Sequence, residues 1–125
     1  MLRVRPPALA ALAVIVLAAA TQPAPPVHAQ ERTRHVVVTA RRFAFDPAVI
    51  EVQQDDLVKV TFRTEDVPHS FTVDEYRIAK RVRVGQSTTF EFRADKAGTF
   101  PYYCNIKTDD GCRQMKGTLI VRPRQ

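Results

Sequence analysis

Hydrophobic and polar residues alternate with a period of two along most of the chain after residue 35. The clearest stretch runs from Leu57 to Thr64, where valine and phenylalanine alternate with lysine, threonine and arginine. The same alternation recurs at 81–84 and at 89–93. A period of two places apolar side chains on one face of an extended segment, so each stretch predicts a half-buried β-strand. No segment carries a convincing helical period.

The spacing of turn residues predicts how these strands are assembled. Turns are expected at Gly85-Gln86 and over 95–98, and Pro47 marks a bend before a short apolar strand at 49–52. About seven or eight short strands with turns every 8–12 residues are typical of a β-sandwich. The prediction is therefore an all-β, Greek-key β-sandwich forming one domain.

The first 29 residues have a different composition from the rest. Arg3 and Arg5 precede an apolar run at 8–20 and a proline-rich spacer. Residues 27–29 are small or otherwise acceptable to a signal peptidase and so offer a cleavage site. This order is typical of a secretory signal peptide, and the apolar run is shorter than the roughly 20 residues of a membrane-spanning helix. We expect cleavage after Ala29, a single domain over 30–125, and a periplasmic or secreted location. An uncleaved N-terminal anchor is the alternative.

Charge excludes some functions. Removing the two arginines of the leader leaves 19 − 2 = 17 basic against 13 acidic residues, a net charge of +4. The charges are interspersed, which is typical of solvated strand faces, and could mildly favour an acidic partner or an anionic membrane. No basic stripe with stacking aromatics indicates a nucleic-acid site. No nucleophile–base pair or phosphate loop is present, so we expect a protein that is not an enzyme. We also expect a monomer.

The candidate chemistry lies in one loop near the C-terminus. The segment 98–121, GTFPYYCNIKTDDGCRQMKGTLIV, contains Cys104, Cys112 and Met115 between two apolar strands. A second candidate, His69, lies far upstream in DVPHSF. Thiolate, thioether and imidazole together are the ligands that copper prefers, and a soft set favours Cu(I).

Two stretches carry a resemblance to a known family. FAFDPAVIEVQQDDLVKVTF looks like the opening of a cupredoxin. The stretch DVPHSFTVDEYRIAKRVRVGQSTTFEFRADKAGTFPYYC resembles the periplasmic copper domain of cytochrome c oxidase subunit II. The similarity covers roughly 36–121 and implies a cupredoxin fold, a copper site and a role in electron transfer.

The ligand loop departs from that family. The resemblance implies a loop of the form C-x3-C-x3-H-x2-M, which binds a dinuclear copper centre together with an upstream histidine. Cys104, Met115 and His69 keep their family positions, but Thr108 replaces the second cysteine and Cys112 replaces the loop histidine. Because Thr108 cannot supply a bridging thiolate, we expect one copper ion, bound by His69, Cys104, Cys112 and Met115.

The cysteines also have a simpler interpretation. Two cysteines in an exported protein often form a disulfide, here Cys104–Cys112.

Two functional hypotheses follow. The first is a mononuclear cupredoxin that transfers electrons to or from a redox partner. The second is a copper carrier or storage protein served by a copper donor or acceptor, or else a metal-free module stapled by the disulfide. Without the membrane hairpin of an oxidase subunit, no oxidase activity is expected.

Overall fold

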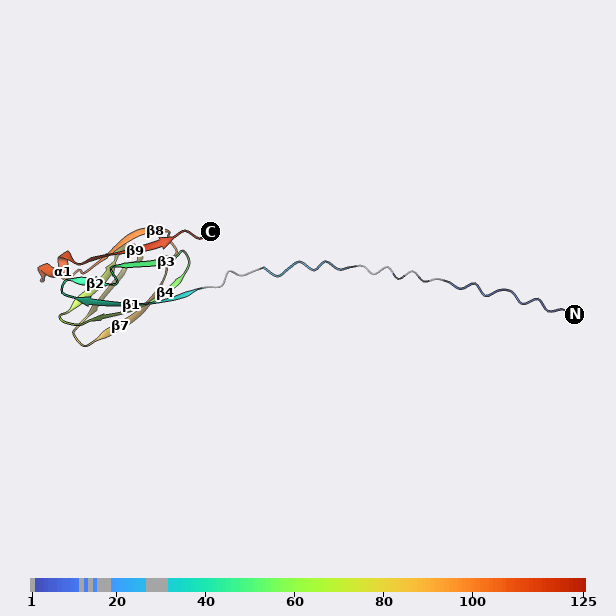
Figure 1. The fold of residues 1–125 in the computed structure, drawn as a ribbon, viewed down its shortest axis with the longest axis horizontal. Coiled ribbons are helices and arrows are strands. Elements are labelled where there is room, and N and C mark those ends of the chain that lie inside the picture. The colour runs from blue at the N-terminus through green and yellow to red at the C-terminus, as the bar shows by residue number, and fades with distance from the viewer. Residues whose placement is uncertain (1, 12, 14, 16–18, 27–31) are drawn as a thin grey trace.

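A computed structural model describes residues 2–11, 13, 15, 19–26 and 32–125 of the chain. Nine strands, one 3-10 helix and one short α-helix form the described part (Figure 1). The strands are β1 (Thr33–Arg41), β2 (Ala44–Asp46), β3 (Val49–Gln53), β4 (Leu57–Thr64), β5 (His69–Val73), β6 (Ile78–Val82), β7 (Ser87–Arg93), β8 (Gly98–Tyr103) and β9 (Lys116–Arg122). The 3-10 helix η1 covers Asp74–Tyr76, and α1 covers Asp110–Gln114.

The strands form two sheets that pack face to face. One sheet has the order β2-β1-β4-β7 and the other the order β3-β9-β8-β5-β6. β1 pairs in parallel with β4, and β3 in parallel with β9, while the remaining pairs are antiparallel. The predicted all-β sandwich is confirmed. The strand count is higher than expected because a three-residue strand such as β2 is too short to show an alternation.

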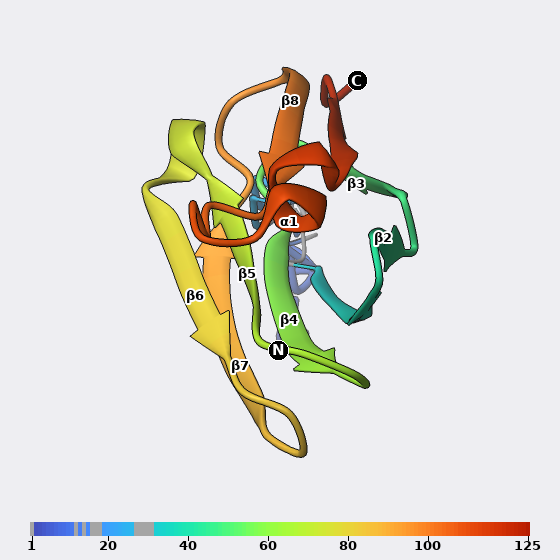
Figure 2. The same cartoon turned by 90° about the vertical axis from the view of Figure 1, so that its left-hand side faces the viewer.

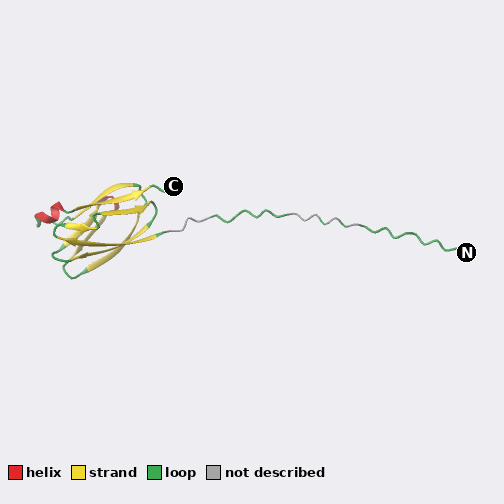
Figure 3. Cartoon of the chain, in the orientation of Figure 1, coloured by secondary structure: helices red, strands yellow, loops and turns green. Residues whose placement is uncertain are grey.

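The only α-helix among the described residues lies at one end of the sandwich, in the loop between β8 and β9 (Figure 3). Figure 2 looks onto this end, where α1 lies across the ends of the strands. The sequence did not predict α1, because five residues are too few to establish a helical period.

The core is built on a cluster of aromatic rings. Tyr102 is fully buried, and its ring centroid lies 4.9 Å from that of Phe71 and 5.3 Å from that of Phe45. The Tyr102 hydroxyl donates a hydrogen bond to the carbonyl of Pro47 at 2.6 Å, so the one polar atom of this side chain is satisfied. Gly117 makes room for the ring, since a Cβ at that position would lie 2.0 Å from Tyr102 Cε2. Strands β8 and β9, which flank the ligand loop, are therefore fixed against each other.

The predicted signal peptide falls only partly within the described residues. The expected cleavage site after Ala29 lies in 27–31, outside them. The described residues before 32 form no helix or strand, and Leu2, Leu9 and Ile15 are exposed. Within the described ranges, no helix has the length and apolar character needed to cross a bilayer.

Candidate metal centre

His69 is the first residue of β5, the strand that lies between β8 and β6. All five residues of β5 are buried, and the exposed fraction of His69 is 0%. On one side, His69 pairs with Val82 of β6. The register of the sheet therefore fixes the imidazole at the end of the sandwich that carries α1.

One nitrogen of the His69 ring is held by a carboxylate. Nε2 lies 2.9 Å from Oδ1 of Asp66, three residues earlier in the chain. Burial alone would raise the pKa of Asp66. Hydrogen bonds from the Arg42 backbone, the His69 ring and the Val67 backbone outweigh that effect and hold the pKa below its ordinary value. An ionised carboxylate only accepts hydrogen bonds, so Nε2 carries the ring proton.

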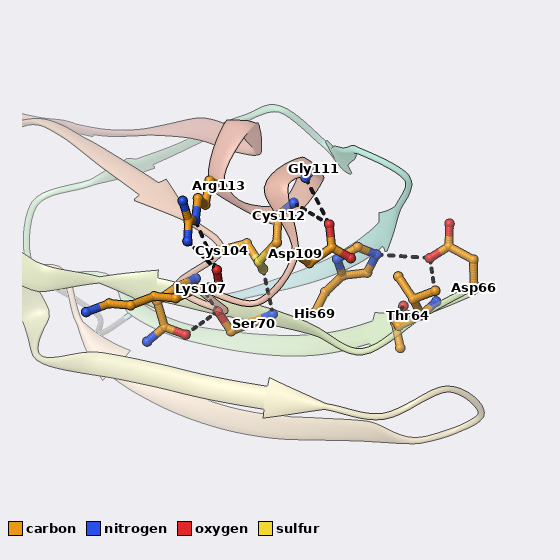
Figure 4. Close-up of a disulfide and its surroundings, with 12 residues drawn as sticks. Thr64, Asp66, His69, Ser70, Cys104, Lys107, Asp109, Gly111, Cys112 and Arg113 are labelled. Atoms are coloured by element: carbon orange, nitrogen blue, oxygen red, sulfur yellow. Dashed lines mark hydrogen bonds and ion pairs between the residues drawn. A yellow bond between two sulfur atoms is a disulfide. The ribbon is translucent and has the colours of Figure 1, made fainter.

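The other ring nitrogen has no partner. His69 Nδ1 is one of two buried side-chain nitrogen or oxygen atoms without a hydrogen bond among the described residues, the other being Thr72 Oγ1. In the neutral ring with its proton on Nε2, Nδ1 presents a lone pair. Figure 4 shows Nδ1 on the side of the ring that faces the disulfide, and Nε2 on the side of Asp66. Most buried polar atoms are paired, so an unpaired imidazole nitrogen on the disulfide side of its ring fits a metal ligand.

The two cysteines come from the end of β8 and from α1. Cys104 follows the last residue of β8, and Cys112 lies inside α1. Their sulfurs are joined in a disulfide, with the two Cα atoms 5.2 Å apart. The backbone N–H of Ser70, the residue after His69, donates to Cys104 Sγ at 3.3 Å. This contact links the histidine strand directly to the ligand loop.

Local hydrogen bonds give the ligand loop its shape. The Asp109 carboxylate accepts from the backbone N–H groups of Gly111 and Cys112 at 2.9 and 3.2 Å and so caps α1. Met115 ends the helix and is fully buried. Its carbonyl accepts from the Cys104 N–H at 3.4 Å, which closes the loop on itself.

The donor set fits copper only when the disulfide is open. Among the described residues, no group of three or more His, Cys, Asp and Glu side chains is arranged to hold a metal ion. With the sulfurs joined, neither is a thiolate, and the thiolate is the form of cysteine that binds metal. After reduction, Cys104 and Cys112 would add two thiolates to the free Nδ1 of His69 and to the thioether of Met115, whose backbone carbonyl contacts Cys104. Such a set is soft and suits Cu(I).

The four ligands predicted from the sequence remain a prediction, and the sequence did not indicate the residues that support them. The structure brings His69, Cys104 and Cys112 to one end of the sandwich, with Met115 closing the same loop. It also adds Asp66, which orients the imidazole, and Ser70, whose N–H meets the cysteine sulfur. A carboxylate three residues before the histidine was the available signal for Asp66. No signal in the side chains marks Ser70, because its backbone makes the contact.

Comparison with known proteins places this geometry in a family. The family model of the cupredoxin-like domain matches residues 8–121. The chain is 32% identical over 92 residues to the nitrous-oxide reductase of Stutzerimonas stutzeri, covering 70% of this chain and 14% of that protein. It is 30% identical over 87 residues to cytochrome c oxidase subunit 2 of Thermus thermophilus, covering 70% of this chain and 52% of that protein. The chain thus spans about half or less of the length of these relatives.

Solved structures share the fold at lower identity. A heme-copper terminal oxidase dimer matches with a TM-score of 0.68 and 18% identity over 77% of this chain and 68% of that one. Auracyanin A, a blue copper protein of Chloroflexus aurantiacus, matches with a TM-score of 0.61 and 15% identity. The match covers 72% of this chain and 99% of that one. A third match is the metal-binding domain of the Cu(I)-exporting ATPase CopA of Streptococcus pneumoniae, solved with Cu(I). Its TM-score is 0.61 at 18% identity, and the match covers 74% of this chain and 88% of that one. The predicted resemblance to cupredoxins and to oxidase subunit II is confirmed, and the chain belongs to the cupredoxin-like domain family.

Proposed function

We propose that this chain is an exported protein that binds one Cu(I) ion through His69, Cys104, Cys112 and Met115 and carries it between partners. Copper is its cargo, bound when the two cysteines are reduced and excluded when they form the disulfide. The observation that carries the proposal is the buried, unpartnered Nδ1 of His69 on the disulfide side of its ring. The leader-like pattern of 1–29 supports export to the periplasm or beyond.

The donor types favour Cu(I) over Cu(II). Two thiolates and a thioether are softer than a set of imidazoles, and soft ligands select Cu(I). Thr108 stands where the oxidase subunit has its second cysteine, which argues for a single ion. The CopA domain supports the idea that this fold can hold Cu(I) in a protein that moves copper.

The cysteine pair favours carriage over electron transfer. A disulfide and a dithiol differ by two electrons, so this site has a redox couple of its own besides that of copper. A centre that shuttled single electrons would have to keep both thiols reduced in every cycle. For a carrier, exchange with a partner disulfide, which takes up the two electrons, closes the bond, removes both thiolate ligands and so releases the ion.

Electron transfer to a redox partner remains the second candidate. The burial of the site favours it, since the exposed fractions of His69, Cys112 and Met115 are all 0%. A rigid buried site can hold both oxidation states of copper in nearly one geometry. For this candidate, an intense thiolate-to-copper absorption with reversible reduction is expected, and Met115→Leu should mainly change the potential.

Copper binding is tested by anaerobic competition for Cu(I) against a colorimetric chelator. The assay compares protein with both thiols reduced and protein with the disulfide intact, each with a free-thiol count. We expect one Cu(I) per chain in the reduced form and none in the disulfide form. Absence of binding in the reduced form would overturn the proposal and leave a metal-free module stapled by the disulfide.

A further inference from the structure

A hollow on the surface opens directly onto the disulfide. It has a volume of about 430 Å³ and is lined by Tyr103, Cys104, Asn105, Ile106, Lys107 and Arg113. Small-molecule sites are typically concave, mostly apolar and about 300–1,000 Å³ in volume. Cys104 directly follows the end of β8, so the hollow brings solvent to one residue of the disulfide.

Only one of the two cysteines lines this hollow. Cys104 has an exposed fraction of 3%, whereas Cys112 has 0% and does not contribute to the lining. A nucleophile that enters the hollow therefore meets Cys104 and not Cys112. The disulfide is asymmetric with respect to attack.

The rim of the hollow carries two cations. Lys107 is exposed, and its ammonium makes no ion pair or hydrogen bond among the described residues. Arg113 donates to the carbonyl of Lys107 and lies 3.8 Å from a carboxylate oxygen of Asp110. Arg113 therefore holds the shape of the rim, while Lys107 leaves a charge open to a ligand.

We infer that this hollow is the binding site of a small anionic thiol that reduces the disulfide by attack at Cys104. The volume suits a molecule of a few residues in size, the apolar lining accommodates its carbon chain, and Lys107 attracts its negative charge. The inference rests on the proposed function, because it supplies the reaction that opens the copper site.

The exchange proceeds in two balanced steps. A thiolate attacks Cys104 Sγ, a new sulfur–sulfur bond forms, and the electron pair of the old bond leaves on Cys112 Sγ, which takes a proton. A second thiolate then attacks the ligand sulfur of this mixed disulfide and releases Cys104 as a thiolate. The Ser70 N–H, 3.3 Å from Cys104 Sγ, stabilises the charge on that leaving sulfur. Two thiols lose two electrons to the protein and leave as their own disulfide.

The site of attack is found by trapping the mixed disulfide. The protein with its disulfide intact is treated briefly with glutathione, quenched with N-ethylmaleimide and digested with trypsin. Cleavage after Lys96, Lys107 and Arg113 separates the two cysteines onto peptides 97–107 and 108–113. We expect glutathione on the peptide of Cys104 and maleimide on that of Cys112. The reverse distribution would overturn the inference.

The charge preference is measured with three thiols of similar size. Reduction rates are compared for anionic mercaptoethanesulfonate, neutral mercaptoethanol and cationic cysteamine, each divided by its rate with an exposed model disulfide. We expect Lys107→Glu to lower the anionic-to-cationic ratio by about three- to tenfold, the size expected for one partly screened charge nearby. Arg34→Glu, at the other end of the sandwich, is the control and should leave the ratio unchanged.

A further arm separates a small thiol from a protein thiol. Reduced thioredoxin is too large to enter the hollow, so it should act more slowly than glutathione at equal thiol concentration. Faster reduction by thioredoxin, or an unchanged ratio in Lys107→Glu, would overturn the small-thiol site. None of these measurements uses copper. A chain that passed them but bound no Cu(I) when reduced would refute the proposed function and keep the thiol site.

Discussion

The two ends of the sandwich differ in how completely their polar groups are paired. The end remote from α1 has a larger hollow, of about 590 Å³, lined by Arg32, Gln53, Asp56, Arg122, Pro123, Arg124 and Gln125. Its charged groups have partners there, since Arg122 pairs with Glu51, and Arg124 lies 3.3 Å from a carboxylate oxygen of Asp55. The α1 end has a smaller hollow but contains the unpartnered Nδ1 of His69 and a disulfide.

This difference makes unpaired polar groups, and not the size of a hollow, the better guide to where a ligand binds. The charges at the remote end form ordinary surface ion pairs and need no ligand as a partner. Each exposed pair contributes little to stability. Burying a nitrogen without a hydrogen-bond partner lowers the free energy of unfolding. This cost is offset if a ligand uses the nitrogen, so the α1 end is where a bound species is expected.

The largest expected effect is on copper affinity. Cys104→Ser removes the principal thiolate, so the affinity of the reduced protein for Cu(I) should fall by more than about 100-fold, beyond the loss typical of outer-shell partners. Arg124→Ala, at the remote end, should have no effect. Chelator competition measures both variants. Full affinity in Cys104→Ser would show that the copper site lies elsewhere.

A glycine-to-alanine substitution in the core beneath the loop should cost more unfolding free energy than the same substitution in the loop. Gly117→Ala places a Cβ 2.0 Å from the buried Tyr102 ring and should lower the free energy of unfolding by about 3 kcal/mol. Gly111→Ala in α1 would meet the Phe43 ring just as closely, but Phe43 is 44% exposed and free to turn outward. Its cost should be about 1 kcal/mol. Equal losses in urea denaturation would contradict this contrast.

Reduction of the disulfide should weaken the metal-free protein. Its cysteines are eight residues apart, and closing so short a loop stabilises a fold by about 2–3 kcal/mol. Urea denaturation with and without a phosphine reductant measures the difference. Added Cu(I) should restore the lost stability by binding the native state. Reduced protein as stable as the disulfide form would show that the loop needs no staple.

A smaller effect is expected from the carboxylate behind the imidazole. Asp66→Asn removes the charge that keeps the proton on Nε2, so Cu(I) affinity should fall by about 10–100-fold. Asp55→Asn breaks an ion pair at the remote end and serves as the matched control. Chelator competition again gives the affinities. If the two variants behaved alike, Asp66 would not be orienting His69.

The smallest effect concerns alkaline pH. Burial raises the pKa of Tyr76 and Tyr102, and the hydrogen bond to Asp74 raises that of Tyr103. A phenol whose pKa is higher in the folded state stabilises the fold below about pH 10, its unfolded pKa. That stability is lost as pH rises through the folded value. Tyrosinate absorbance should therefore appear at higher pH in the folded protein than in urea-unfolded protein. Coincident titrations would contradict the shifts.

The sequence predicted strands well where one face is buried. β4 has the predicted bounds because Val58, Val60 and Phe62 are buried while their neighbours are not. Phe71 and Val73 of β5 alternate with Ser70 and Thr72, which indicated a strand, but alternation could not show that both faces of β5 are buried. α1 depends on a single cap by Asp109, a contact that no period of hydrophobic residues reveals.

The site was only partly predictable for a related reason. The donor types of His69, Cys104, Cys112 and Met115 marked them as candidates, and the resemblance to a ligand motif linked them as one set. The hydrophobic pattern indicated none of them. The spacing of Asp66 from His69 was its one signal in the sequence, and that spacing gains meaning only when β5 places the carboxylate against the ring. The orphaned state of Nδ1 is a property of three-dimensional packing, so only the structure could show it.

The role of the His69 ring is tested most directly by the nitrogen resonances of its imidazole in the reduced protein. Long-range proton–nitrogen NMR spectra are recorded before and after one equivalent of Cu(I) is added without oxygen. We predict an unprotonated Nδ1 whose resonance shifts strongly on binding, while Nε2 keeps its proton and its bond to Asp66. An unchanged Nδ1 resonance in protein that has bound copper would contradict the assignment of His69 as a ligand.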